Sequence, residues 1–277
     1  MNHPILPYRI FPLGDSAITI DLGNRIDPIL NREVIARYDQ LLQMPLPGMI
    51  EVVPAYSSIT VYYDVMMLKK KIPPHQTVFE WMKQQLAERL EQPARQDQIN
   101  ERILSIPVCY EEEFAMDIQH LASTKNISVD EVIQIHSARQ YKVYMLGFLP
   151  GFPYMGEVDE KIAMPRKPQP VNIEAGSVGI AGKQTGIYPL NSPGGWQIIG
   201  RTPLKIFEAP PRTSFPSFSM LARPQGEALD SESLNMSLAE PTLLKAGDLV
   251  QFYSITKNDF YEIQNSPSPQ SGEGVGG

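Results

Sequence analysis

The pattern of apolar and polar positions predicts a small sheet in the first part of the chain. Short runs rich in β-branched and aromatic residues lie at 8–11, 17–21, 52–53 and 59–63. Turn residues separate these runs, and Gly14-Asp15 lies between the first two. The spacing indicates a few short strands, and the chain contains no internal repeat.

Two helices are predicted among these strands. Asp27 is a favourable N-cap and Pro28 suits the first helical position, so one helix starts there. It is expected to end near Met44, because two prolines follow. The residues Thr77-Val-Phe-Glu80 form a capping-box pattern that starts a second helix, which runs to about Leu90. Strands mixed with helices make the first part a small α+β unit.

The second part reads as mostly β. A polar segment at 92–100 is the predicted linker, and the strand 103–110 follows it. A helix is expected at 117–124, and Ser128-Val-Asp-Glu131 is another capping box. Short strands with glycine or proline turns then continue to a closing strand at 249–253, which is typical of a sandwich or barrel.

Two segments interrupt or follow this pattern. Residues 209–237 are rich in proline and serine, and we expect a long, mobile insertion there. Residues 265–277 have low complexity and are expected to be disordered. The predicted domains are therefore a small α+β domain at 1–95, a mostly β domain at 101–260 and a tail at 265–277.

Composition narrows the class of protein. The chain has 277 residues, 42% of them hydrophobic, and a net charge of −7, which argues against a nucleic-acid binder. Cys109 is the single cysteine, so an intrachain disulfide and a multi-cysteine zinc site are excluded. Apolar runs are too short to span a membrane, and the first residues do not resemble a secretory signal. A cytoplasmic protein is the expectation.

Glycine and proline are unusually dense at 141–202, with aromatic and polar residues between them. Glycine allows close backbone approach and proline fixes φ, so such a region suits rigid loops around a binding site. A β-rich domain with many tight turns is the plainer explanation of the glycines. It explains less well the polar and aromatic cluster in the same region, which consists of Lys183, Gln184, Tyr188, Trp196 and Arg201.

Four blocks of this region carry a family resemblance: GFLPGFPYMG, PRKPQP, AGSVGIAGKQTGIYP and SPGGWQIIGRTP. They resemble the signature blocks of the bacterial family of 5-oxoprolinase B subunits. That family includes the sporulation-kinase inhibitor KipI and has also been labelled allophanate hydrolase subunit 1. The resemblance runs from about Tyr8 to Tyr253. It implies a cyclophilin-like β-barrel for the second part, behind the smaller α+β domain.

The resemblance also implies an activity. The protein would be one component of 5-oxoprolinase, a complex with a larger C subunit plus an A subunit that opens the lactam of 5-oxoproline to glutamate. ATP, with Mg²⁺, would be consumed by the assembled complex, and the isolated chain would be inactive. One alternative is a regulatory protein that binds and inhibits a sensor histidine kinase. Another is the partner half of a urea-carboxylase-like carboxyltransferase.

His136 is the first candidate for chemistry. Val129, Val132 and Ile133 share its face of a predicted helix, so the imidazole lies on an apolar side. A buried histidine beside a partner can titrate near neutral pH. The other possibility is a core histidine with its hydrogen bonds satisfied, and the sequence leaves both open. Histidines at metal-ligand spacing are absent, so no metal site is expected.

The run from Gly176 to Gly186 invites comparison with a phosphate loop. It is not a Walker A motif, because its spacing is one residue too long and Gln184 replaces the Ser or Thr. The run could still present N–H groups to an anion, with Lys183 as a point charge. The plainer alternative is a glycine-rich hairpin with Lys183 in solvent. The chain also lacks the G-x-S-x-G elbow of serine hydrolases.

Arg166 and Arg201 are candidate anion ligands, because guanidinium can hold a carboxylate or phosphate by two hydrogen bonds. Surface ion pairs are the alternative role for both. We predict one pocket, walled by 176–186 on one side and by Tyr188, Trp196 and Arg201 on the other. The candidate catalytic residues are His136, Lys183 and Arg201. The candidate substrate-binding residues are Arg166, Gly176, Gly179, Gly182, Gln184, Tyr188 and Trp196.

Overall fold

The computed structural model describes residues 7–23, 25–92, 102–209 and 241–266. The chain divides into two compact units. The first contains Met1–Arg102 with the short segments Val143–Leu146 and Lys245–Asp248, and the second contains the remainder. All but Gln92 of the predicted linker at 92–100, nearly all of the predicted insertion at 209–237, and residues 267–277 of the predicted tail lie outside the described residues.

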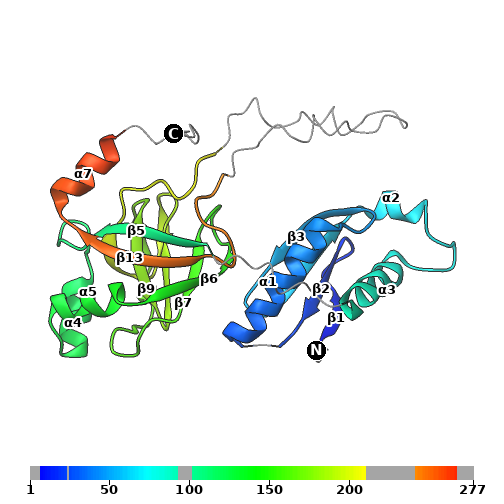
Figure 1. Ribbon diagram of the computed structural model, residues 1–277, viewed down its shortest axis with the longest axis horizontal. Coiled ribbons are helices and arrows are strands. Elements are labelled where there is room, and N and C mark those ends of the chain that lie inside the picture. The colour runs from blue at the N-terminus through cyan, green and yellow to red at the C-terminus, as the bar shows by residue number, and fades with distance from the viewer. Residues whose placement is uncertain (1–6, 24, 93–101, 210–240, 267–277) are drawn as a thin grey trace, which may run out of the picture. The chain divides into compact units, whose positions relative to one another are not determined.

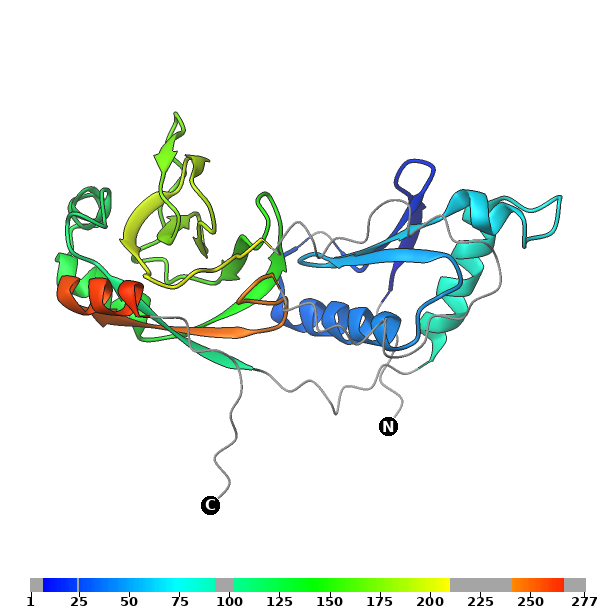
Figure 2. The same ribbon diagram turned by 90° about the horizontal axis from the view of Figure 1, so that it is seen from above.

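The first unit is a four-stranded antiparallel sheet with helices on one face (Figures 1 and 2). The strand order is β1-β2-β4-β3. Helix α1 packs against β3 and β4, and α3 packs against β2. The bounds are β1 Arg9–Pro12, β2 Ala17–Asp21, α1 Pro28–Gln43, β3 Met49–Pro54, β4 Ser58–Tyr63, α2 Val65–Lys69 and α3 Val78–Glu91.

Local signals in the sequence set the ends of both long helices. The Asp27 carboxylate accepts hydrogen bonds from the N–H groups of Ile29 and Leu30, which confirms the predicted start of α1. Thr77 and Glu80 form the predicted reciprocal capping box at α3. Apolar side chains of both helices then share one core with the sheet. That core includes Ile18, Ile20, Ile59, Val61, Val34, Leu41, Met82 and Leu86.

The second unit is a closed seven-stranded barrel, which confirms the expected α+β architecture with a barrel domain. The order is β10-β7-β6-β13-β5-β12-β9. Strand β13 runs parallel to β5 along seven residue pairs, and the two lie side by side in Figure 1. The bounds are β5 Ile103–Cys109, β6 Gln140–Leu146, β7 Pro153–Gly156, β9 Ser177–Ala181, β10 Gln184–Ile187, β12 Gln197–Arg201 and β13 Leu249–Ile255. A small separate pair joins β8 (Val171–Ile173) to β11 (Ser192–Gly194).

Among the described residues, the helices that accompany the barrel are α4 (Ile118–Lys125), α5 (Val129–Ser137) and α7 (Lys257–Asn265). Helix α7 is not among the predicted elements, because it is short and its sequence is mostly polar. Its signal is nevertheless local, since Thr256 and Asp259 form a capping box at its start. The predicted disordered tail therefore begins at the last residue of a helix.

Strands β9 and β10 have two different faces. On one face, Ile180 and Thr185 lie directly opposite each other and are fully buried. On the other face, Gly179 lies opposite Gly186. An aromatic layer covers this glycine face. We use that name for four side chains that contact one another through their rings: Phe152, Tyr154, Tyr188 and Trp196.

The two glycines make room for the aromatic layer. A Cβ on Gly179 would lie 3.0 Å from Cβ of Trp196. A Cβ on Gly186 would lie 2.9 Å from the Pro153 carbonyl oxygen and 3.0 Å from ring atoms of both Phe152 and Trp196. Side chains at these positions would crowd Trp196. The glycine density in this region thus has a packing role that the turns alone do not explain.

We predict that Gly186→Ala destabilises the barrel by about 1–3 kcal/mol, because the new methyl group overlaps a carbonyl oxygen and two rings. Gly195→Ala is the matched control, since its Cβ would meet nothing closer than 3.4 Å. Urea unfolding should be followed by the fluorescence of Trp196 in a Trp81→Phe background, which leaves a single tryptophan. Equal midpoints for the two variants would contradict the packing role.

Candidate functional site

The guanidinium of Arg166 lies over the indole of Trp196, with Cζ 5.8 Å from the ring centroid. Trp196 is only 4% exposed, whereas Arg166 is exposed to solvent. Phe152 supports the indole edge-on at 5.2 Å between centroids, and Tyr154 lies at 6.0 Å. An exposed cation–π contact of this kind contributes about 0.5–1 kcal/mol. The cation is thus held at the surface of a rigid aromatic layer.

The backbone on both sides of Arg166 is fixed by hydrogen bonds. Each bond joins the 164–167 segment to a strand or turn of the barrel. Because both flanks are fixed, Arg166 loses less conformational entropy when it binds a ligand. The bonds run from Gly182 N to Met164 O (2.6 Å), from Gln197 Nε2 to Pro165 O (3.0 Å) and from Lys167 N to Gly195 O (2.7 Å).

Two tyrosines of the aromatic layer complete the surroundings of Arg166. Burial raises the pKa of Tyr154, and the positive charge of Arg166 opposes this rise. Burial likewise raises the pKa of Tyr188, whose hydroxyl also accepts a hydrogen bond from the backbone N–H of Trp196. Both phenols therefore stay neutral at physiological pH. A negatively charged ligand at Arg166 meets no competing anion from these two groups.

The structure separates the other two predicted cations. Lys183 lies in the turn between β9 and β10, is exposed, and pairs with Glu160 at 2.5 Å. Arg201 pairs with Ser177 at the opposite end of β9, where it forms an ion pair with Glu174. The prediction of a single pocket that holds both Lys183 and Arg201 is therefore wrong, because the two residues lie at opposite ends of β9.

The glycine run from 176 to 186 is a hairpin of the barrel. Strand β9 is paired with β10 on one side and β12 on the other, and β10 is paired with β9 and β7. Gln184 belongs to this ladder, opposite Ala181. Since ladder pairing occupies these N–H groups, the run does not fit the phosphates of ATP as a cradle.

Two glycines of the run have turn roles. Gly182 has φ +61° in the hairpin turn, and Gly176 has φ +83°. A Cβ on Gly176 would lie 2.4 Å from the carbonyl oxygen of Thr202, so only glycine allows that approach. Both glycines lie just beyond the ends of β9, where the chain turns with a positive φ that favours glycine.

His136 lies in the core with both ring nitrogens hydrogen-bonded. Nδ1 lies 2.8 Å from the Tyr110 hydroxyl, and Nε2 lies 3.1 Å from Oγ1 of Thr185. The Thr185 hydroxyl donates to the Gly179 carbonyl, so it accepts the proton of Nε2. This order makes Tyr110 the donor to Nδ1 and fixes a neutral imidazole. The ring also stacks on Phe252 at 4.6 Å.

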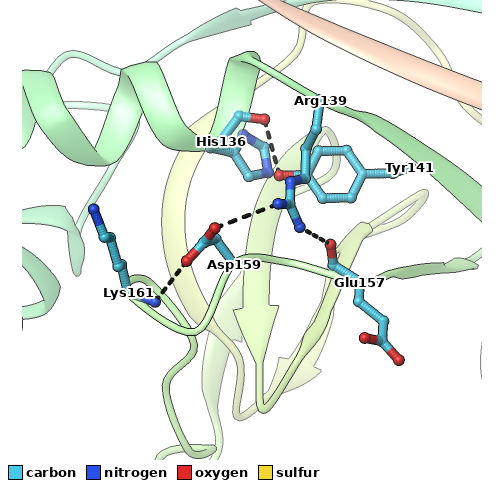
Figure 3. A network of polar contacts seen from close by, with 6 residues as sticks. All are labelled: His136, Arg139, Tyr141, Glu157, Asp159 and Lys161. Carbon is cyan, nitrogen blue, oxygen red and sulfur yellow. Dashed lines mark hydrogen bonds and ion pairs between the residues drawn. The ribbon is translucent and has the colours of Figure 1, made fainter.

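A polar network links the end of α5 to the 157–161 segment (Figure 3). The Tyr141 hydroxyl donates to the His136 carbonyl at 2.9 Å, and Arg139 reaches Glu157 O and the Asp159 carboxylate. Asp159 also accepts from the Lys161 N–H at 3.0 Å. The network orients α5 and leaves the imidazole fully buried. His136 therefore occupies the core-histidine role that the sequence had left open.

Sequence reasoning missed Phe148, Asp117 and Lys167. Phe148 is 67% exposed, has φ +67°, and contacts Phe152 edge-on at 5.9 Å. It extends the aromatic layer to the surface. Asp117 and Lys167 form an ion pair of 2.6 Å beside Arg166. Asp117 and Lys167 are 50 residues apart in the sequence, so no local pattern predicts that they meet.

The described ranges contain neither a metal-binding cluster nor a membrane-spanning helix. No group of three or more His, Cys, Asp or Glu residues in this part of the chain could hold a metal ion. No helix among the same residues is long and apolar enough to cross a membrane.

Comparison with known proteins identifies similar sequences. The family model for the carboxyltransferase domain, subdomain C and D, matches residues 8–216. The B subunit of 5-oxoprolinase from Bacillus subtilis (strain 168) is 43% identical over 256 residues, which cover 92% of this chain and 95% of that protein. The B subunit of 5-oxoprolinase from Haemophilus influenzae (strain Rd) is 33% identical over 248 residues, which cover 88% and 96%.

A solved structure has a similar fold. The crystal structure of TTHA0988 matches with a TM-score of 0.65 and 30% sequence identity. The match covers 86% of this chain and 40% of TTHA0988, so the chain spans about two fifths of that protein.

We predict that His136 makes stability depend on pH. Burial lowers its pKa from 6.5 to about 3, so below pH 6.5 the unfolded chain binds a proton that the folded chain excludes. The contribution is fully present above pH 6.5 and is lost as the pH falls towards 3, by up to about 1.4 kcal/mol per pH unit. Urea unfolding between pH 6.5 and 5 should show this slope, and His136→Gln should flatten it. Identical slopes would contradict a neutral, buried imidazole.

Proposed function

The chain belongs to the family of 5-oxoprolinase B subunits, and from this premise we propose that it is one component of an ATP-dependent complex that opens 5-oxoproline to glutamate. The guanidinium of Arg166 lies above Trp196 on a backbone segment held by hydrogen bonds, and this is the observation that supports a substrate site in this chain. The substrate is a five-membered lactam that carries a carboxylate. Such a molecule has a flat face for an aromatic surface and an anion for a guanidinium.

In this proposal, Arg166 holds the substrate carboxylate by two parallel hydrogen bonds. The lactam ring then lies beside the aromatic layer, where Tyr154 is half-buried and neutral. The role of this chain is to bind and orient the substrate. Neither His136 nor Lys183 takes part, because the first is enclosed in the core and the second lies in the β9–β10 turn.

The reaction needs activation of the lactam, since an amide carbonyl is a poor electrophile. Transfer of the γ-phosphoryl group of ATP to the amide oxygen would make the lactam carbonyl carbon electrophilic enough for water to attack it. Addition of water, cleavage of the C–N bond and loss of phosphate then yield glutamate. Because the glycine hairpin does not fit phosphates, we propose that another protein of the complex supplies the ATP and Mg²⁺ site.

The partners in this proposal are the C subunit of 5-oxoprolinase, which is the close heteromeric partner, and its A subunit. The exposed ring of Phe148 contacts Phe152 of the aromatic layer, and the exposed Arg166 lies over Trp196 of the same layer. A partner that covers them would exclude water from the bound substrate and strengthen the Arg166–carboxylate contact.

Reconstitution tests the proposal. The chain should co-purify with the C subunit, and addition of the A subunit should give ATP-dependent release of glutamate from 5-oxoproline. The isolated chain should be inactive. Turnover by the isolated chain would contradict the proposed role in a complex. Absence of turnover in the complete complex, together with inhibition of a sensor histidine kinase by the chain, would favour the regulatory alternative.

We predict that Arg166→Ala raises the KM of the assembled complex for 5-oxoproline at least about 30-fold, because the substrate carboxylate loses a charged partner. Lys183→Ala removes the same charge from the exposed turn and should change KM less than about twofold, as expected for a surface ion pair. Steady-state kinetics of both variants check this. A larger effect of Lys183→Ala would place the substrate at the hairpin turn instead.

A further inference from the structure

Asp117 occupies the N-cap position of α4 but does not cap the helix. Aspartate is among the preferred N-cap residues because its carboxylate accepts the free N–H groups of the first turn. At α4 the side chain makes no capping hydrogen bond. The carboxylate is directed elsewhere, which gives up the usual local stabilisation of the helix.

The Asp117 carboxylate instead connects two other segments. Its Oδ2 accepts a hydrogen bond of 2.7 Å from the Ile198 N–H and forms an ion pair of 2.6 Å with Lys167 Nζ. The Asp117 N–H donates to the Ile198 carbonyl at 2.9 Å. Asp117 is therefore fixed to β12 by its backbone and side chain, and β12 begins one residue after Trp196.

Lys167 follows Arg166 directly and ties its segment to the same place. Its N–H donates to the Gly195 carbonyl, next to Trp196, while its ammonium group reaches Asp117. The side chains of Lys167 and Asp117 are only 14% and 17% exposed, so solvent screens the pair little. One ion pair thus joins the residue after Arg166 to the strand after Trp196.

We infer that the Asp117–Lys167 ion pair is a positioning device that sets the guanidinium of Arg166 over Trp196 for an incoming carboxylate. Neither residue touches the ligand in this arrangement, and both act through Arg166. The inference rests on the proposed substrate role of Arg166. It adds two positioning residues and explains why the N-cap of α4 is given up.

A double-mutant cycle in the assembled complex tests the inference. Lys167→Met should raise the KM for 5-oxoproline about tenfold, within the usual range of coupling between neighbouring residues, with kcat little changed. In an Arg166→Ala background the same substitution should change KM less than about twofold, because its effect passes through Arg166. An equal effect in both backgrounds would overturn the inference.

Three further variants separate positioning from folding. Lys167→Arg keeps the charge and should restore most of the wild-type KM. Asp117→Asn keeps an acceptor for the Ile198 N–H but loses the charge, so it should reproduce the effect of Lys167→Met even if the latter folds poorly. Lys205→Met, which removes an exposed lysine paired with Glu208, is the control and should leave KM unchanged. If Lys205→Met raised KM as much as Asp117→Asn does, the inference would be overturned.

A readout without substrate keeps this inference distinct from the proposed function. In the Trp81→Phe background of the isolated chain, acrylamide quenching of Trp196 should rise in Arg166→Ala and rise equally in Lys167→Met. If quenching rises in both variants but the complex never turns over 5-oxoproline, the proposed function fails and the positioning role stands. Unchanged quenching in Lys167→Met would overturn the positioning role, whatever the kinetics.

Discussion

The close approach of an indole ring to bare backbone is the constraint on which the candidate site depends. Gly179 and Gly186 lie opposite each other on β9 and β10, and a Cβ at either position would lie within 3.0 Å of a neighbouring atom. Trp196 can therefore pack against the barrel and carry Arg166 on its outer side. A side chain at either glycine would crowd Trp196, which carries the cation.

The other face of the same two strands shows how the barrel keeps this surface rigid. Thr185 alternates with Gly186 along β10, so its hydroxyl points to the opposite face and meets His136. The chain of donors from Tyr110 through His136 to Thr185 ends on the Gly179 carbonyl. The carbonyl of a glycine that seats Trp196 is thus fixed by the buried histidine network. His136 supports the site from behind, without contact with a ligand.

The sequence predicted those features that depend on neighbouring residues. The starts of α1 and α3 follow from Asp27 and Thr77, which cap the residues just after them. Of the glycines predicted to line the pocket, Gly179 and Gly186 lie against Trp196, whereas Gly176 and Gly182 do not. The prediction that Lys183 and Arg201 share one pocket is wrong, because they lie at opposite ends of β9. The charge of a residue carries no information on strand register, so the sequence could not reveal this.

Asp117 illustrates the same limit. A local rule predicts that it caps a helix, but its carboxylate forms an ion pair with Lys167, a residue 50 positions away.

The most direct test of the account is a structure of the assembled complex with 5-oxoproline bound. The substrate carboxylate should lie within hydrogen-bonding distance of the Arg166 guanidinium, with the lactam ring against the aromatic layer. A substrate bound beside Lys183 in the hairpin turn, with Arg166 in solvent, would contradict it.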